Sequence, residues 1–162
     1  MKKTVFCFVL AVGIMMSLSF CSSTHAMVVD TDVPADQTVK VTFVNSTNDG
    51  WFVVTKWNNT SVVEELYGGK DVASNDISIL TVPAGDTGFT FEVHFTLSKI
   101  NSVTTHSYKN IEIRYDLEPG KEYHIKGLSK SSGYFMKYEL FVGIYDAADG
   151  TLLKELKIGE VE

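Results

Sequence analysis

Cysteine is scarce in this chain, and its placement restricts the chemistry of everything that follows it. The 162 residues include two cysteines, Cys7 and Cys21, and both precede residue 27. A domain that begins after them has no disulfide to staple it and no cysteine that could act as a nucleophile or a metal ligand. For an exported protein, this composition fits a bacterial envelope better than a small disulfide-rich secreted domain.

Basic residues are also few. When Lys2 and Lys3 are set aside, 12 lysines and arginines remain against 20 aspartates and glutamates, a formal charge of −8. Nucleic acid and anionic membrane surfaces are poor partners for such a charge. We therefore expect no nucleic-acid partner, and membrane contact only through an anchor attached to the chain.

The usual motifs of catalysis and metal binding are missing as well. The sequence has no Gly-x-Ser-x-Gly turn, no His-x-His or His-Glu-x-x-His pair and no acidic calcium loop. We interpret His94, His106 and His124 as solvated or cross-strand paired residues. We predict no catalytic residue, cofactor or metal site and expect a protein that is not an enzyme. A hydrolase that assembles a histidine and carboxylates from separate strands is the least favoured alternative.

One long apolar run is present, at the N-terminus. Lys2 and Lys3 precede 16 mostly apolar residues, Val5 to Phe20, and a polar segment follows at once. A transmembrane helix needs about 20 apolar residues, whereas a basic start, a shorter apolar core and a polar end are typical of an export signal. The sequence therefore predicts a protein that works outside the cytoplasm.

Two cleavage sites could end this signal. A cut after Ala26 leaves small residues, Thr24 and Ala26, at the two positions that must be small. The signal peptide would then comprise residues 1–26, and a soluble, secreted chain would begin at Met27.

The second cut lies before Cys21 and gives a lipoprotein signal of residues 1–20. Leu18-Ser19-Phe20-Cys21 resembles the bacterial lipoprotein pattern, in which the cysteine becomes lipidated. Phe20 departs from that pattern, which has Gly, Ala or Ser before the cysteine. Lipidation at Cys21 would hold the protein in the periplasm or at the cell surface, and both cuts remain open at this point.

The remainder of the chain divides into a leader and one domain. Residues 27–38 are acidic and are expected to be weakly structured, serving as a tether if Cys21 is lipidated. Residues 39–162 are expected to form a single domain, because the roughly 135 residues from Met27 onward suffice for one hydrophobic core and are too few for two.

Apolar and polar residues alternate from Val39 onward in short runs separated by Gly, Asn, Asp and Pro, the pattern of antiparallel strands. The clearest runs are 88–97 and 110–117, whose odd-numbered residues should face a core. The run 151–158 also fits a short helix, but the Asp149-Gly150 turn favours a strand. The other predicted strands are 39–44, 51–57, 61–66, 77–82, 123–128 and 138–145.

Eight or nine strands are too many for one sheet with a single covered face. We therefore predict an all-β, antiparallel two-sheet β-sandwich of immunoglobulin-like or transthyretin-like type, with a small β-barrel as the alternative. The connections 45–50, 82–86, 118–121 and 146–150 contain turn residues, and each is predicted to join its flanking strands as a pair.

Two of these turns carry a resemblance. Val82-Pro83-Ala84-Gly85 precedes an alternating aromatic strand, and Glu118-Pro119-Gly120-Lys121 is followed by Tyr123. Over residues 77–128 the chain resembles small exported bacterial β-sandwich domains, of the lipoprotein type, whose function is uncharacterised. The resemblance implies a fold and an exported location, and it assigns no functional residue.

Aromatic residues beside polar loops are the candidate ligand contacts. Trp51, Trp57 and Tyr67 flank polar, Asn-rich loops, and such rings can stack on a sugar or anchor a protein partner. Strand periodicity predicts that Trp51 and Trp57 share one face. Packing in the core or on the strand surface is the other interpretation.

Together these features predict an exported, non-enzymatic envelope or surface protein that presents a β-sandwich to a protein or glycan partner. The alternative is an accessory domain that binds carbohydrate or a small molecule. Exposure of both tryptophans would support a binding role.

Overall fold

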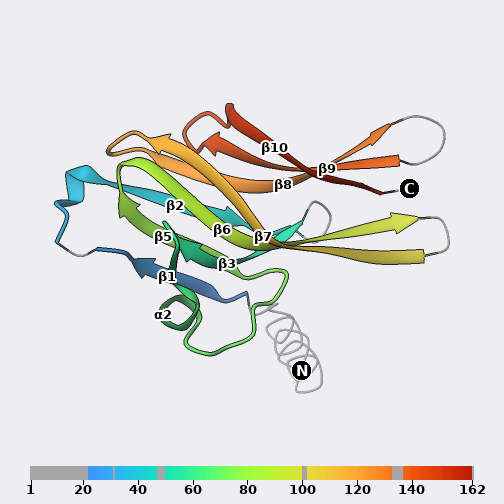
Figure 1. The fold of residues 1–162 in the computed structure, drawn as a ribbon, viewed down its shortest axis with the longest axis horizontal. Coiled ribbons are helices and arrows are strands. Elements are labelled where there is room, and N and C mark those ends of the chain that lie inside the picture. The colour runs from blue at the N-terminus through green and yellow to red at the C-terminus, as the bar shows by residue number, and fades with distance from the viewer. Residues whose placement is uncertain (1–21, 31, 47–49, 100–101, 133–136, 162) are drawn as a thin grey trace, which may run out of the picture.

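Strands make up nearly all of the regular structure (Figure 1). The computed structural model describes residues 22–30, 32–46, 50–99, 102–132 and 137–161, so Cys21 and the lipidation expected there lie outside the described residues. The elements in chain order are β1 (Thr24–Val28), the 3-10 turn η1 (Ala35–Gln37), β2 (Thr38–Val44), β3 (Trp51–Trp57), β4 (Thr60–Ser61), α2 (Val63–Tyr67), β5 (Ile77–Pro83), β6 (Gly85–Lys99), β7 (Ser102–Leu117), β8 (Glu122–Ser132), β9 (Lys137–Asp146) and β10 (Leu152–Val161).

The ten strands of the described residues form two open sheets. The larger has the order β1-β5-β2-β8-β9-β10 and the smaller the order β4-β3-β6-β7. Neighbouring strands are antiparallel except for the parallel pairs β1–β5 and β2–β8. The predicted all-β two-sheet sandwich is confirmed, and the sheets do not close into the barrel considered as an alternative.

The alternating runs are strands, with one exception. All but the first residue of the run 151–158, for which a helix is the alternative, lies in β10. The strand predicted over 61–66 is wrong beyond Ser61, because residues from Val63 form α2. Val62 and Leu66, one helical turn apart, are both buried by this arrangement. Gly68, in the left-handed conformation with φ 59°, ends the helix.

Three of the four predicted strand pairs are wrong, because the turns cross between sheets. The connections from β2 to β3, from β5 to β6 and from β7 to β8 each lead from one sheet to the other. The turn 146–150 does join adjacent strands, β9 and β10. Turn residues reverse the chain, but they do not determine whether the next strand pairs with the last one or crosses over the core.

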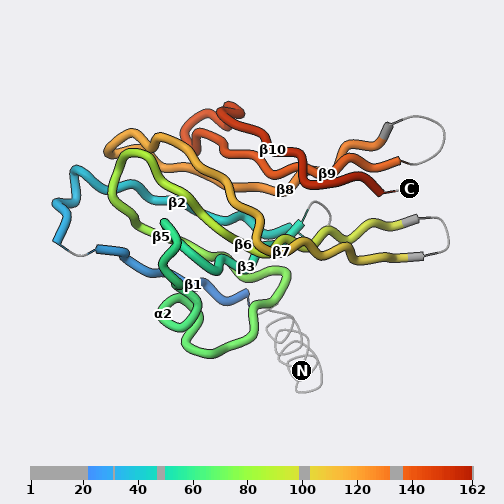
Figure 2. Tube along the Cα trace, in the orientation of Figure 1, coloured from blue at the N-terminus to red at the C-terminus, as the bar shows by residue number. Residues whose placement is uncertain are grey.

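The weakly structured leader expected over 27–38 is also wrong at its start. Met27 and Val28 end β1, which pairs in parallel with β5 along the edge of the larger sheet. Figure 2 shows this N-terminal segment following β5. The domain therefore begins upstream of residue 27, within the stretch that the sequence assigned to the longer export signal.

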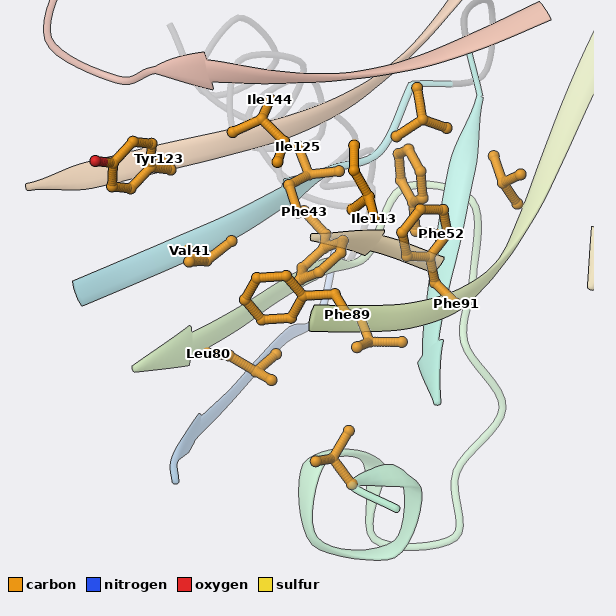
Figure 3. Packing of buried hydrophobic residues seen from close by; sticks show 14 of the residues in the cluster. Val41, Phe43, Phe52, Leu80, Phe89, Phe91, Ile113, Tyr123, Ile125 and Ile144 are labelled. Carbon is orange, nitrogen blue, oxygen red and sulfur yellow. The ribbon is translucent and has the colours of Figure 1, made fainter. Parts of the chain in front are cut away.

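The core lies between the sheets and is rich in aromatic rings. Figure 3 shows Phe43 of the larger sheet among Phe52, Phe89 and Phe91 of the smaller one. These rings meet edge to face, with centroids 5.6 Å apart for Phe43 and Phe89 and 5.3 Å apart for Phe52 and Phe91. Such contacts stabilise by about 0.5–1.5 kcal/mol beyond the burial of area.

The inward positions predicted for the run 88–97 are confirmed. All five are buried: Phe89, Phe91, Val93, Phe95 and Leu97. The polar residues between them therefore lie on the outer face of the smaller sheet. The β6–β7 and β8–β9 hairpins extend from the same end of the sandwich (Figure 1).

Candidate functional site

Trp51 and His94 lie side by side on the outer face of the smaller sheet. Trp51 begins β3, and its register partner on β6 is His94. The two rings are stacked, with centroids 3.9 Å apart and planes inclined by 13°. Both residues are partly exposed. Side chains alternate between the two faces of a strand, so Val93 and Phe95 point into the core while His94, between them, points outward with Trp51.

Three polar side chains surround the imidazole of His94. Its Nδ1 lies 2.7 Å from Ser107 Oγ on β7, and its Nε2 lies 4.0 Å from Glu92 Oε2. Glu92 in turn pairs with Lys109, at 3.4 Å between Oε1 and Nζ. We call Trp51, Glu92, His94, Ser107 and Lys109 the outer-face cluster.

The strand register explains how these residues meet. A bulge in β7 sets two residues, Lys109 and Asn110, against Glu92 of β6. Asn110 takes a positive φ of 56°, a conformation that asparagine tolerates better than most residues. The extra residue brings Lys109 beside the carboxylate of Glu92 while Ser107 stays opposite His94.

The environment of His94 favours its neutral form. Burial lowers the pKa of the imidazole, nearby Lys109 lowers it further, and Glu92 offsets part of the effect. A neutral imidazole carries one hydrogen-bond donor and one acceptor. The outer-face cluster thus combines an aromatic ring with neutral, anionic and cationic hydrogen-bonding groups.

A second bulge, in β3, turns Trp57 to the opposite face. The pairing with β6 shifts by one residue at Thr55, and Trp57 then lies opposite the buried Phe89. Trp57 packs against the hydrophobic core, and its indole N–H is buried with no hydrogen-bond partner in the described structure. The prediction that Trp51 and Trp57 share one face is wrong, and Trp57 does not join the outer-face cluster.

Tyr67 is not a ligand contact either. It lies at the end of α2 and is 3% exposed. Its hydroxyl accepts the N–H of Val54 at 2.8 Å and lies 3.1 Å from Ser78 Oγ. Asn45 plays a similar part, because its Oδ1 accepts the N–H of Phe52 at 2.9 Å. Two side chains thereby bond the edge of β3 where β4 does not reach.

A separate polar group surrounds Asp76, the residue before β5, whose backbone carbonyl accepts a hydrogen bond from Asn45 Nδ2. Its carboxylate accepts hydrogen bonds from the N–H of Ser23 at 2.9 Å and of Ala73 at 2.8 Å, and lies 3.3 Å from His25 Nε2. The ring of His25 also meets Tyr67 edge to face, with centroids 5.0 Å apart. Burial of these groups points to a structural role.

Sequence reasoning missed His25 because it assigned the residue to the export signal. In the structure, Thr24 to Val28 alternate between exposed and partly exposed positions, as in an edge strand. Their residue types, Thr-His-Ala-Met-Val, do not alternate between polar and apolar, so periodicity could not have placed His25 in the fold.

The other histidines do not gather functional groups in the same way. His124 lies in β8, where burial lowers its pKa and Lys126 adds to the effect. His106 lies opposite Phe95 on β7. Within the described residues, no group of three or more His, Cys, Asp or Glu side chains could hold a metal ion.

A pocket of about 350 Å³ lies away from the outer-face cluster, between the turns 120–122 and 146–148. Its charged groups include Lys121 and Asp146, which pair with each other at 3.8 Å. Two exposed turns form this hollow, and it offers a ligand fewer kinds of functional group than the outer-face cluster does.

The chain matches no protein-family model, no curated protein and no solved structure. Among the described residues, no helix is long and apolar enough to cross a membrane. Function must therefore be inferred from the residues and their geometry.

Proposed function

We propose that this chain is an exported, non-enzymatic surface protein that binds a glycan through the outer-face cluster. The stacking of Trp51 on His94, beside Ser107, is the observation that carries the proposal. Export rests on the N-terminal signal. Lipidation at Cys21 would retain the protein in the periplasm or at the cell surface, and its absence would release a soluble form.

The chemistry of the outer-face cluster suits a sugar. A pyranose ring offers an apolar C–H face to an indole and hydroxyl groups to neighbouring donors and acceptors. His94, Ser107 and Glu92 supply such groups around Trp51. The formal charge of −8 beyond Lys2 and Lys3 favours a neutral glycan over an acidic one.

The shape of the face favours a polymer over a small molecule. Small ligands usually bind in concave pockets that bury most of their surface. The outer-face cluster instead lies across three adjacent strands, β3, β6 and β7, on the flank of a sheet. Polar residues continue along this face, where the hydroxyls of Thr96 and Thr105 lie 3.4 Å apart. A chain of sugars can follow such a row.

A protein partner is less well supported. The large apolar side chains exposed in the described structure come from four elements: Val28, Val63, Val103, Leu152 and Leu153. Single exposed apolar residues are normal on soluble proteins and do not by themselves mark an interface.

Tryptophan fluorescence can test glycan binding directly. The chain has two tryptophans, so a Trp57→Phe protein reports on Trp51 alone. We expect neutral polysaccharides to change this emission, and Trp51→Ala and His94→Ala, assayed by affinity electrophoresis, to weaken binding at least tenfold. Lys126→Ala is the matched control, since Lys126 lies over Tyr145 on the larger sheet. Unchanged binding by Trp51→Ala would overturn the proposal.

Hydrolysis is a second candidate, favoured by one contact. Ser107 Oγ lies 2.7 Å from His94 Nδ1, and Glu92 lies on the other side of the ring. The 4.0 Å to Glu92 is long for a triad, and the N–H groups of a regular strand lie in the sheet plane and do not converge above Ser107 as an oxyanion hole requires. Turnover of an activated ester that Ser107→Ala abolishes would support hydrolysis.

A further inference from the structure

The first strand of the fold spans the bond that the longer export signal would lose. The carbonyl of Ser23 accepts the N–H of Ile77 at 2.9 Å, and the N–H of Val29 donates to the carbonyl of Thr81 at 2.8 Å. Between these two bonds, β1 pairs with β5 residue by residue. The Ala26–Met27 bond therefore lies in the middle of a hydrogen-bonded strand.

The residues before that bond also supply polar contacts to a buried carboxylate. Asp76 is 4% exposed, and it bonds with the N–H of Ser23 and with His25 Nε2. Burial alone would raise its pKa, but the hydrogen bonds from Ala73, Ser23 and His25 outweigh that effect and lower it. The carboxylate is therefore ionised at neutral pH, and a buried ion requires partners of this kind.

A cut after Ala26 would dismantle this arrangement. It would remove Ser23 and His25, leave Met27 and Val28 as the remainder of β1, and leave the N–H of Ala73 as the remaining described donor to the carboxylate of Asp76. A cut before Cys21 would remove none of these contacts. A targeting segment is discarded after export and takes no part in the native fold.

We infer that the export signal is hydrolysed upstream of Ser23, so that the mature protein keeps β1 whole. The inference rests on the export proposed above. Of the two cuts that the sequence offers, the one before Cys21 meets this condition. It leaves a single residue, Ser22, between Cys21 and the first hydrogen-bonded residue of the sheet.

This position of the cut changes how an anchored form would stand on a membrane. In place of the tether expected over residues 27–38, about 7 Å of chain, the span of two extended residues, would connect Cys21 to Ser23 at the edge of the sheet. A lipid on Cys21 would then hold the edge of the larger sheet close to the membrane.

The N-terminus of the protein purified from its host of origin tests the inference. Digestion and mass spectrometry of the N-terminal peptide give its first residue and any attached lipid. We expect a first residue later than Met1 and no later than Ser23, with or without lipid. A chain that begins after Ser23, at Met27 above all, would overturn the inference and leave export intact. A chain that still begins at Met1 would overturn the export on which the inference rests.

A substitution in the full-length precursor gives an independent test. Ala26 is exposed in β1, so Ala26→Leu is compatible with the fold, whereas a bulky residue at that position blocks a cut after it. We expect the Ala26→Leu precursor to be converted to mature protein in the exporting host as completely as the wild-type precursor. Val28→Leu, another exposed position of β1, is the matched control. Precursor that accumulates with Ala26→Leu and not with Val28→Leu would overturn the inference.

Discussion

Trp51 covers His94. The indole and imidazole planes lie within 13° of parallel, with centroids 3.9 Å apart, although the two residues are 43 positions apart in the sequence. This contact contributes to the burial that lowers the pKa of His94. The tryptophan therefore helps to set the protonation state of the histidine at the centre of the outer-face cluster.

Removal of the indole should raise the pKa of His94 toward its ordinary value, because Trp51→Ala opens the imidazole to water. NMR titration of the imidazole protons measures the shift. His124 provides an internal control, since its lowered pKa arises on the other sheet. A pKa of His94 that is unchanged in Trp51→Ala would show that the stack does not control its protonation.

Stability should fall as the solution is acidified below neutrality. His94 and His124 both have lowered pKa values in the folded protein. Below about pH 6.5 the unfolded chain therefore takes up their protons first, and the free energy of unfolding decreases until the folded pKa values are reached. Urea unfolding of wild type and of the double variant His94→Gln, His124→Gln at about pH 7.5 and 5.5 measures the effect. We expect a smaller decrease in the variant; equal decreases would contradict this assignment.

His25→Ala should destabilise the fold by about 1.5–3 kcal/mol, the range for hydrogen bonds to a charged group. The variant removes a partner from the buried Asp76 and the edge contact with Tyr67. Lys121→Ala is the comparison, because the ion pairs of Lys121 with Glu118 and Asp146 involve an exposed ammonium group and should contribute little to stability. Urea unfolding of both variants gives the difference, and a smaller loss for His25→Ala than for Lys121→Ala would refute the structural role of His25.

Tyr67→Phe should cost about 1–3 kcal/mol, because it leaves the N–H of Val54 and the hydroxyl of Ser78 buried without their shared partner. Ser78→Ala should cost less, since the tyrosine hydroxyl would still accept the N–H of Val54. Thermal or urea unfolding of the two variants shows which of them loses more free energy of unfolding. The reverse order would mean that the hydroxyl does not support the edge of β3.

Alternation along the sequence predicted the interior well where strands are regular. Every apolar position expected in the core between residues 88 and 97 is buried. The same reasoning failed for Trp57, because a single extra residue at Thr55 reverses the face of the sheet toward which each later side chain of β3 points. Nothing in the local composition of Thr55 distinguishes it from an ordinary strand residue. The outer-face cluster likewise depends on the pairing of β3, β6 and β7, which local sequence does not specify.

The beginning of the domain was misjudged for a different reason. The short polar stretch after the apolar run satisfies the requirements of a signal-peptide end and of an edge strand equally well. Its partner, β5, lies about fifty residues further along the chain, and the contact of His25 with Asp76 spans 51 positions. Only the folded arrangement separates the two interpretations.

The bonds that Asn45 and Tyr67 make to β3 bear on how copies of this protein behave when crowded together. An open strand edge invites the edge of a neighbouring molecule, and sheets that join in this way grow into aggregates. Here the amide hydrogens of Phe52 and Val54 are already occupied by side chains of the same molecule. Neighbouring copies would find no vacant amides at these two positions, which favours separate molecules even at high local density.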